Sequence, residues 1–152
     1  MTHSLPRVIL HASCVVVAGR GLLICGRSGS GKSGLALQLM GYGAGLVADD
    51  RVELWVQADH ARREAQVMAG APDGLPALIE ARHVGLLRAD LQPPVPLCAV
   101  ADMDRVETER LPVQMHTTVL DHEFALFHRV DSPHFAAALM QYLKAGALDA
   151  DV

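Results

Sequence analysis

The chain has 152 residues, a length that suits one domain (1–152) built around one hydrophobic core. Hydrophobic residues make up 51% of it, which is enough apolar surface to offset chain entropy and excludes a disordered chain. The formal net charge is -4 and no basic patch stands out, so nucleic acid is not an expected partner.

Cysteine usage and apolar run lengths bear on the compartment. The 3 cysteines, Cys14, Cys25 and Cys98, are odd in number and far apart, which predicts a reducing, cytoplasmic compartment and no disulfide framework. Residues 1–10 contain no long apolar segment, so we expect no signal peptide. No apolar run reaches the roughly 18–20 residues of a membrane span, so no membrane association is expected.

The first elements surround a glycine-rich loop. Residues 15–17 and 22–25 are apolar runs separated by Gly19-Arg20-Gly21, a pattern typical of a hairpin between buried strands. After the loop, Leu35, Leu39 and Tyr42 recur at helical spacing, and Gly41 and Gly43 end the predicted helix.

The remaining elements are shorter. Residues 46–48 form an apolar run, residues 51–57 alternate like a half-buried strand, and residues 65–69 are its predicted partner after a polar turn. Residues 70–76 are loop, residues 79–88 fit either a strand or an irregular loop, and residues 97–103 are a predicted strand. At the end, Ser132 is the predicted N-cap and Pro133 the first residue of a helix whose apolar face is Phe135, Leu139 and Leu143, closed by Gly146.

The glycine-rich loop carries the strongest signal. Gly26-Arg27-Ser28-Gly29-Ser30-Gly31-Lys32-Ser33 fits the phosphate-binding pattern G-x-x-x-x-G-K-S between a strand and a helix. The glycines let successive N–H groups point at phosphate oxygens, and the helix adds its positive end. Lys32 supplies a cation to the β- and γ-phosphates, and the Ser33 hydroxyl can ligate Mg²⁺. The motif predicts ATP with Mg²⁺ and does not name the acceptor.

Two adjacent carboxylates follow the next predicted strand. Asp49 and Asp50 end the apolar run of residues 46–48, about one strand and one helix beyond the loop. An Asp at such a strand end orients magnesium in P-loop proteins, usually through water. Adjacent residues at a strand end can face different sides, so one aspartate could serve the metal and the other could act as base toward an acceptor hydroxyl. The alternative is a pair of solvated turn residues.

Taken together, these residues resemble a known family. A strand beginning at His11, the loop of residues 26–33 and Leu46-Val47-Ala48-Asp49-Asp50-Arg51-Val52 resemble the catalytic domain of HPr kinase/phosphorylase. The family's Glu-Ile-Arg-Gly motif is similar to Glu80-Ala81-Arg82-His83. The resemblance covers residues 11–88, about half of the chain. It implies an α/β P-loop kinase domain of the HPr kinase / phosphoenolpyruvate carboxykinase type, with mixed sheets and flanking helices.

The resemblance also implies roles for the motif residues. Lys32 would hold phosphate and Ser33 would bind magnesium. Asp50 would accept the proton of the acceptor serine, and Asp49 would support the metal or the base.

Three further roles follow from the resemblance alone. Glu80 would be a second magnesium ligand, His11 would sit beside the aspartates and tune them, and Arg82 would stabilise charge on the transferred group. Without the resemblance, His11 reads as an ordinary structural histidine. Glu80 and Arg82 then read as an exposed strand face.

The sequence departs from the family in two places. It starts just before His11, as in short forms that consist of the catalytic domain alone. The family's downstream basic motif would fall on residues 111–119, which contain no Lys or Arg. The sequence therefore does not predict phosphorylase activity, and Arg129 is a candidate replacement that no pattern requires.

The hypothesis that results is an ATP- and Mg²⁺-dependent protein serine kinase. Its implied acceptor is an HPr-type phosphocarrier protein of the sugar phosphotransferase system, and the resemblance suggests a homo-oligomer. Two alternatives remain open: a nucleotide-dependent binding module with little transfer activity, and a small-molecule kinase built on the same loop.

Overall fold

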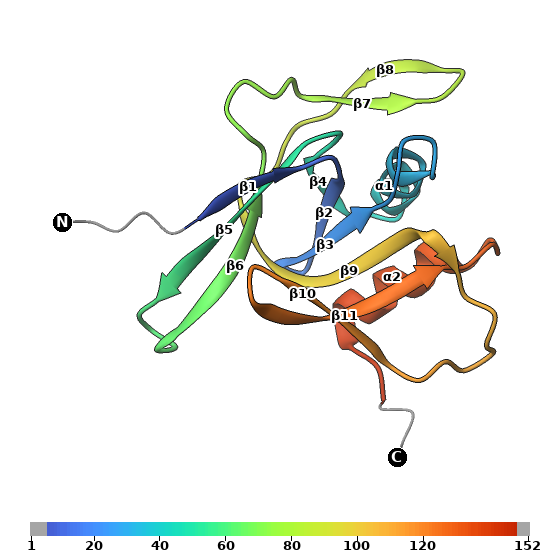
Figure 1. The fold of residues 1–152 in the computed structure, drawn as a ribbon. Coiled ribbons are helices and arrows are strands. Elements are labelled where there is room, and N and C mark those ends of the chain that lie inside the picture. The colour runs from blue at the N-terminus through green and yellow to red at the C-terminus, as the bar shows by residue number, and fades with distance from the viewer. Residues whose placement is uncertain (1–5, 149–152) are drawn as a thin grey trace.

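A computed structural model describes residues 6–148 of the chain (Figure 1). Within these residues, a 9-stranded sheet curls back on itself, and a separate 2-stranded sheet lies beside the first helix. Residues 1–5, part of the segment expected to lack a signal peptide, and residues 149–152, the end of the predicted domain, lie outside the described residues.

The described elements have these bounds: β1 (Arg7–Leu10), β2 (Ser13–Val17), β3 (Arg20–Cys25), α1 (Lys32–Gly41), β4 (Gly45–Ala48), β5 (Val52–Asp59), β6 (Glu64–Gly70), β7 (Leu78–Ala81), β8 (Gly85–Arg88), β9 (Val95–Val106), β10 (Met115–Val119), β11 (His122–Arg129) and α2 (Phe135–Ala145). The large sheet runs in the order β1-β5-β6-β9-β3-β2-β4, with β11 also on β9 and β10 on β11.

The predicted hairpin before the glycine-rich loop is confirmed as β2 and β3. Val17 pairs with Arg20, and the two residues between them, Ala18 and Gly19, have φ angles of 53° and 76°. Positive φ at both positions is the geometry of a tight hairpin turn whose twist matches the strands. The predicted strand start at His11 is wrong, because His11 lies in the turn between β1 and β2.

Strand directions gather several strand ends at one edge. Strand β2 lies between β3 and β4 and is antiparallel to both, so β3 and β4 run in the same direction. Next along the sheet, β9 is parallel to β3, and β11 is parallel to β9. Residues Cys25, Asp102 and His128 are level with one another across these three strands. The loops after all four parallel strands therefore share one edge, which is where open α/β sheets bind ligands.

The first helix follows the glycine-rich loop as predicted. Its residues Leu35, Ala36 and Leu39 are buried against the sheet. Tyr42 was predicted on the same stripe, and this is wrong, because Tyr42 is the C-cap and is 57% exposed. The chain turns away there, since Gly43 adopts a φ of 109°.

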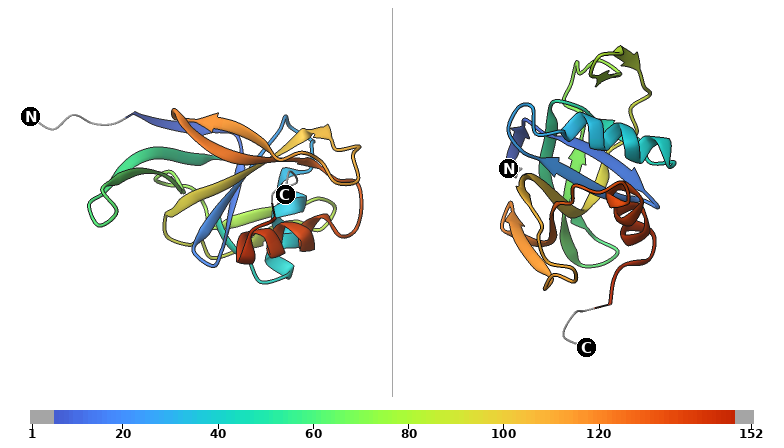
Figure 2. Two further views of the ribbon diagram at one scale, coloured as in Figure 1. Left: turned by 90° about the horizontal axis from the view of Figure 1, so that it is seen from below. Right: turned by 90° about the vertical axis from the view of Figure 1, so that its right-hand side faces the viewer.

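The second helix lies on the same face of the sheet (Figure 2). Its predicted apolar face of Phe135, Leu139 and Leu143 is buried. The predicted N-cap is wrong: the cap is His134, not Ser132, and the helix starts at Phe135. The Ser132 hydroxyl contacts the His134 ring at 2.8 Å, so it does not cap a main-chain N–H.

Two cores result from the curl of the sheet. One lies between the sheet and the two helices and includes Leu22, Ile24 and Leu39. The other lies inside the curl and includes Cys14, Val52 and Leu54, which belong to strands from opposite ends of the sheet order. In the part of the chain that the structure describes, neither helix has the length and apolar character needed to cross a bilayer.

Residues 51–103 follow the predicted order with longer strands. The predicted partners 51–57 and 65–69 pair as β5 and β6. Residues 79–88, which the sequence left open, form the β7–β8 hairpin that projects beside α1 (Figure 1). The strand predicted over 97–103 extends from Val95 to Val106. The sequence did not predict β1, β10 or β11.

Candidate active site

The glycine-rich loop at the end of β3 has the backbone of an anion cradle. The φ angles of Gly26, Gly29 and Gly31 are 146°, 82° and 100°. Residues other than glycine rarely adopt such backbone angles. A Cβ at Gly26 would collide with the Ser30 side chain. Within the described residues, the buried Ser30 hydroxyl has no hydrogen-bond partner. The loop therefore fits a ligand that takes up main-chain N–H groups, as the sequence predicts for phosphates.

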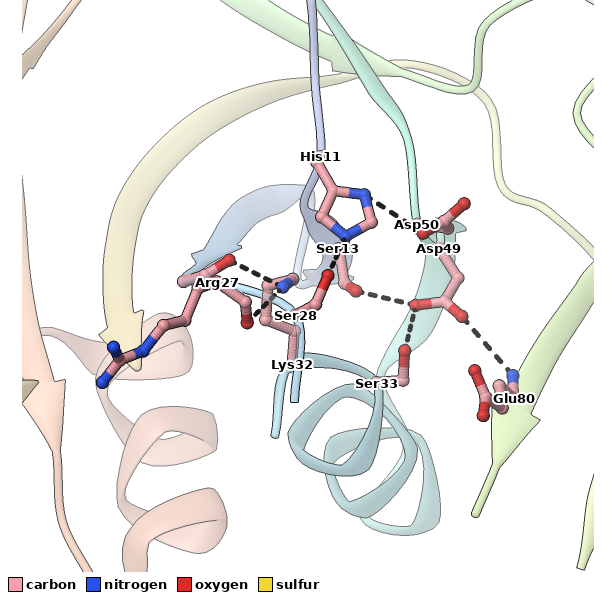
Figure 3. Close-up of polar contacts among 10 residues, drawn as sticks. His11, Ser13, Arg27, Ser28, Lys32, Ser33, Asp49, Asp50 and Glu80 are labelled. Carbon is pink, nitrogen blue, oxygen red and sulfur yellow. Dashed lines mark hydrogen bonds and ion pairs between the residues drawn. The ribbon is translucent and has the colours of Figure 1, made fainter. Parts of the chain in front are cut away.

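The Lys32 side chain bonds to the main chain of this loop. Its side chain is 7% exposed, and Nζ donates hydrogen bonds to the carbonyl oxygens of Gly26 at 2.6 Å and Arg27 at 2.9 Å. Both bonds hold a cation against the loop at the N-terminus of α1 (Figure 3). A buried ammonium group at the N-terminus of a helix favours a polyanion.

Asp49 is the centre of a buried hydrogen-bond network at the end of β4. Its Oδ1 accepts hydrogen bonds from the hydroxyls of Ser13 at 2.7 Å and Ser33 at 2.8 Å, and Oδ2 accepts one from the Glu80 N–H at 3.4 Å. The carboxylate is 7% exposed, so these donors replace water. The network ties the first turn of α1 to the strand end.

Asp50 faces the other way, as two adjacent residues at a strand end allow. It is exposed, its φ is 72°, and its Oδ1 lies 3.2 Å from Nδ1 of His11. The other ring nitrogen of His11, Nε2, lies 3.4 Å from the Ser28 hydroxyl in the glycine-rich loop. His11 thus bridges the loop and the exposed carboxylate (Figure 3).

The donors around Ser33 fit magnesium held together with a nucleotide. Ser33, Asp49 and Glu80 line one pocket of about 280 Å³, together with Asp50 and Leu86. Among residues 6–148, no group of three His, Cys, Asp or Glu side chains could hold a metal ion by itself. Mg²⁺ is usually bound by one or two carboxylates plus substrate phosphates, so this donor set suits it when the loop is filled.

The structure does not bring every predicted residue into this cluster. Arg82 is exposed and sits in the turn between β7 and β8. None of the hydrogen bonds and ion pairs found within residues 6–148 involves its guanidinium. The other predicted residues, His11, Lys32, Ser33, Asp49, Asp50 and Glu80, meet at one edge of the sheet.

Sequence reasoning missed a second pair of carboxylates on the far side of the loop. Oδ1 of Asp104, near the end of β9, accepts a hydrogen bond from the main-chain N–H of Arg27 at 3.0 Å. The same oxygen lies 3.5 Å from Nε of the Arg27 side chain. Asp102 in turn accepts a hydrogen bond from the Asp104 N–H at 2.9 Å. The signal was present, since both residues sit at the end of a predicted apolar strand.

The cysteine nearest the loop is a poor nucleophile. Burial, followed by the nearby Asp102 carboxylate, raises the pKa of Cys25 to about 11, and Lys32 opposes the shift. A thiol with such a pKa stays protonated at neutral pH. Cys25 is therefore not expected to act as a nucleophile at this edge.

Comparison with known proteins identifies the group to which these residues belong. Residues 3–91 match the family model of the HPr Serine kinase C-terminal domain, which is more than half of the chain. The chain belongs to this family. The glycine-rich loop, the acid pair and the β7–β8 hairpin all fall inside the matched stretch.

Curated relatives match over parts of their length. The chain is 44% identical over 82 residues to the HPr kinase/phosphorylase of Limosilactobacillus reuteri (strain DSM 20016), covering 54% of this chain and 24% of that protein. It is 36% identical over 118 residues to the HPr kinase/phosphorylase of Caldicellulosiruptor bescii, covering 77% of this chain and 35% of that protein. The matched stretches thus span about a quarter to a third of these relatives.

A solved structure shares the fold. The structure described as the Hpr(Ser) kinase/phosphatase from Coxiella burnetii superposes with a TM-score of 0.68 at 18% identity, covering 90% of this chain and 88% of that chain. This likeness extends beyond residue 91, where the family model ends. The predicted α/β fold of the HPr kinase type is therefore confirmed.

Proposed function

We propose that this chain uses ATP and Mg²⁺ to phosphorylate a serine hydroxyl on an HPr-type phosphocarrier protein. The observation that carries the proposal is the arrangement of Ser33, Asp49 and Asp50. Asp49 is buried and accepts a hydrogen bond from the Ser33 hydroxyl, to which we assign magnesium, and its neighbour Asp50 is exposed beside the glycine-rich loop. A metal-side carboxylate next to an accessible one is what transfer to a hydroxyl requires.

Each group then has a role in the transfer. The loop N–H groups and Lys32 bind the β- and γ-phosphates, and Asp50 accepts the proton of the acceptor serine. The serine oxygen bonds to the γ-phosphorus while the bond from that phosphorus to the bridging oxygen breaks, and ADP leaves. Bound Mg²⁺ would neutralise charge on the phosphate oxygens. Ser33, with Asp49 and Glu80, would hold it there.

His11 supports Asp50 as the proton acceptor. Its ring lies 3.2 Å from the Asp50 carboxylate and 3.4 Å from the Ser28 hydroxyl, so it fixes the carboxylate relative to the loop. Positioning of this kind supplies much of the rate in phosphoryl transfer, because the protein performs little covalent chemistry itself.

A labelling assay tests the proposal. The protein is incubated with ATP labelled in the γ-phosphate, Mg²⁺ and a purified HPr-type carrier, and the carrier is then analysed for phosphoserine by mass spectrometry. We expect label on one serine, dependent on Mg²⁺ and lost on chelation. Absence of label on the carrier, with ATP bound to the protein, contradicts the proposal.

A second candidate is a nucleotide-dependent binding module. Residues 111–119 contain no Lys or Arg, and Arg82 stays exposed in the β7–β8 turn, so Lys32 is not joined in the cluster by the second cation that the family resemblance implies. Such a module would bind the carrier with ATP present and transfer nothing. Calorimetric titration of the carrier with and without ATP, run beside the labelling assay, separates the two functions.

A further inference from the structure

The side chain of Asp104 attaches the first turn of the glycine-rich loop to β9. Its Oδ1 accepts the main-chain N–H of Arg27 at 3.0 Å. The proposed transfer assigns no role to this carboxylate. We infer that Asp104 is a positioning residue for phosphoryl transfer, which holds the loop in the shape that binds phosphate. The inference rests on the proposed function, because it assumes that the loop binds a triphosphate.

Asp104 and Lys32 hold the two ends of one peptide unit. The peptide that joins Gly26 to Arg27 donates its N–H to Asp104, and its carbonyl oxygen accepts a hydrogen bond from Lys32 Nζ at 2.6 Å. Because this unit is planar and trans, its N–H and its carbonyl point in opposite directions. The carboxylate that fixes the N–H therefore also fixes the carbonyl that binds the ammonium group.

The next carbonyl of the loop depends on the same peptide. The carbonyl oxygen of Arg27 accepts hydrogen bonds from Lys32 Nζ at 2.9 Å and from the Ser30 N–H at 3.1 Å. A rotation of the peptide before Arg27 would displace this oxygen as well. Without Asp104, the position of Lys32 and the turn that ends at Ser30 would both be less well fixed. Groups held in place in advance bind a ligand at lower cost in entropy.

A bulge in β9 directs Asp104 toward the loop. His128 and Arg129 are consecutive in β11, yet they pair with Asp102 and Val106 of β9. The three β9 residues between these partners, with Asp104 in the middle, are therefore extra on one side of the pair. Bulges of this kind re-aim a side chain and are common next to active sites.

Two side chains hold the bulge itself. The Asp102 Oδ1 accepts a hydrogen bond from the Asp104 N–H at 2.9 Å. From β11, Nη1 of Arg129 donates a hydrogen bond to the carbonyl oxygen of Met103 at 3.0 Å. The backbone on both sides of Met103 is thus tied down, which gives Asp104 a fixed base from which to hold the loop.

The hydrogen bond, and not the charge, carries the positioning role. Nε of Arg27 lies 3.5 Å from the same Asp104 oxygen, with the two side chains 83% and 40% exposed, so this ion pair contributes little stability. The Arg27 side chain points away from Asp49 and Asp50 (Figure 3). Its guanidinium offsets the negative charge that Asp104 places near the phosphate-binding loop. An uncharged acceptor at position 104 should therefore hold the loop equally well.

Variants of equal charge separate the hydrogen bond from the charge. Asp104→Asn keeps a side-chain oxygen that can accept the Arg27 N–H, whereas Asp104→Ala and Asp104→Leu keep none. Asp59→Ala is the matched control, because the Asp59 Oδ1 also accepts main-chain N–H groups, from Ala61 at 3.1 Å and Arg62 at 3.3 Å. Asp59 ends β5 at the turn into β6, away from the acid pair that precedes β5. Calorimetry with Mg²⁺ present gives dissociation constants for ATP and for inorganic tripolyphosphate, and thermal unfolding checks each fold.

We expect Asp104→Ala and Asp104→Leu to bind both ligands about three- to tenfold more weakly than Asp104→Asn, the value of one hydrogen bond. Asp104→Asn and Asp59→Ala should bind both ligands about as tightly as the parent protein. Equal affinities of the Asn, Ala and Leu variants, or equal weakening by Asp59→Ala, overturn the positioning role and leave the proposed function standing. Failure of the parent protein to bind either ligand overturns the proposed function as well.

Discussion

Ser33 donates a hydrogen bond of 2.8 Å to Asp49, which joins the first turn of α1 to the end of β4. The same carboxylate oxygen accepts a second hydrogen bond, of 2.7 Å, from Ser13 at the start of β2. The hydroxyl that the sequence assigns to magnesium is thus held in place by two strands. A metal ion bound to the Ser33 hydroxyl would therefore lie close to the Asp49 carboxylate without rearrangement of the backbone.

Ser13→Ala should destabilise the protein, because Ser13 is fully buried and its loss leaves Asp49 with one donor fewer. We expect the free energy of unfolding to fall by about 1–3 kcal/mol. Urea denaturation followed by circular dichroism measures it. Thr108→Ala, at an exposed position, should change the free energy little. Equal stability of Ser13→Ala and the parent would show that the bond to Asp49 is not stabilising.

Asp50→Asn should slow transfer severely and leave ATP affinity nearly intact. Asparagine tolerates the left-handed backbone of this position, where φ is 72°, so the fold should persist. The amide cannot accept the serine proton, and loss of the base should lower the rate by about 10²–10⁴-fold. Single-turnover labelling of the carrier and calorimetry with ATP give the two quantities. Asp73→Asn, an exposed control, should retain activity, and normal transfer by Asp50→Asn would remove Asp50 from the mechanism.

The part of the site that depends on residues adjacent in sequence could be predicted from the sequence. The loop of residues 26–33 works through consecutive N–H groups, so its motif carries its own geometry. The opposite facing of Asp49 and Asp50 follows equally from their adjacency at a strand end. Local patterns also predicted the β2–β3 and β5–β6 hairpins, because turn residues and alternation lie within a few positions.

Contacts between distant strands could not be predicted in the same way. Ser13 reads as one small residue in an apolar run, and its role depends on the pairing of β2 with β4. Asp104 meets Arg27 only because β9 lies parallel to β3. The strand β11 alternates weakly in polarity and six of its eight residues are only partly buried, so its pattern did not reveal that it carries Arg129 to the loop.

Gly26→Ala should weaken nucleotide binding, because φ is 146° and the added methyl group would collide with Ser30. The loop must then shift, and the carbonyl that holds Lys32 shifts with it. We expect ATP affinity to fall at least about tenfold, since the N–H cradle depends on these dihedral angles.

Gly41→Ala is the matched control for that variant. Gly41 ends α1, and a Cβ there meets nothing within 4 Å. This substitution should keep ATP binding and leave stability unchanged or raise it by up to about 1 kcal/mol. Calorimetry and thermal unfolding report both effects. Normal ATP binding by Gly26→Ala would show that the loop does not need its observed backbone.

Stability should fall in alkali through the buried thiol of Cys14. Burial, with a smaller contribution from Cys25, raises the pKa of Cys14 from 9.0 to about 12. The unfolded chain therefore loses this proton at lower pH than the folded chain does. The stabilisation is complete below about pH 9 and is lost as the pH rises toward 12, with each pKa unit equal to about 1.4 kcal/mol.

Cys14→Ala isolates this contribution from the other groups that titrate in alkali. Cys25 and Tyr142, whose pKa values burial also raises, remain in both proteins, so the difference between the two stability curves reports mainly on Cys14. The variant loses some packing at every pH, because Cys14 is fully buried. Its free energy of unfolding should nevertheless decline less steeply between pH 9 and 11 in urea titrations. Parallel curves for the two proteins would mean that the thiol ionises as readily in the folded chain as in the unfolded one.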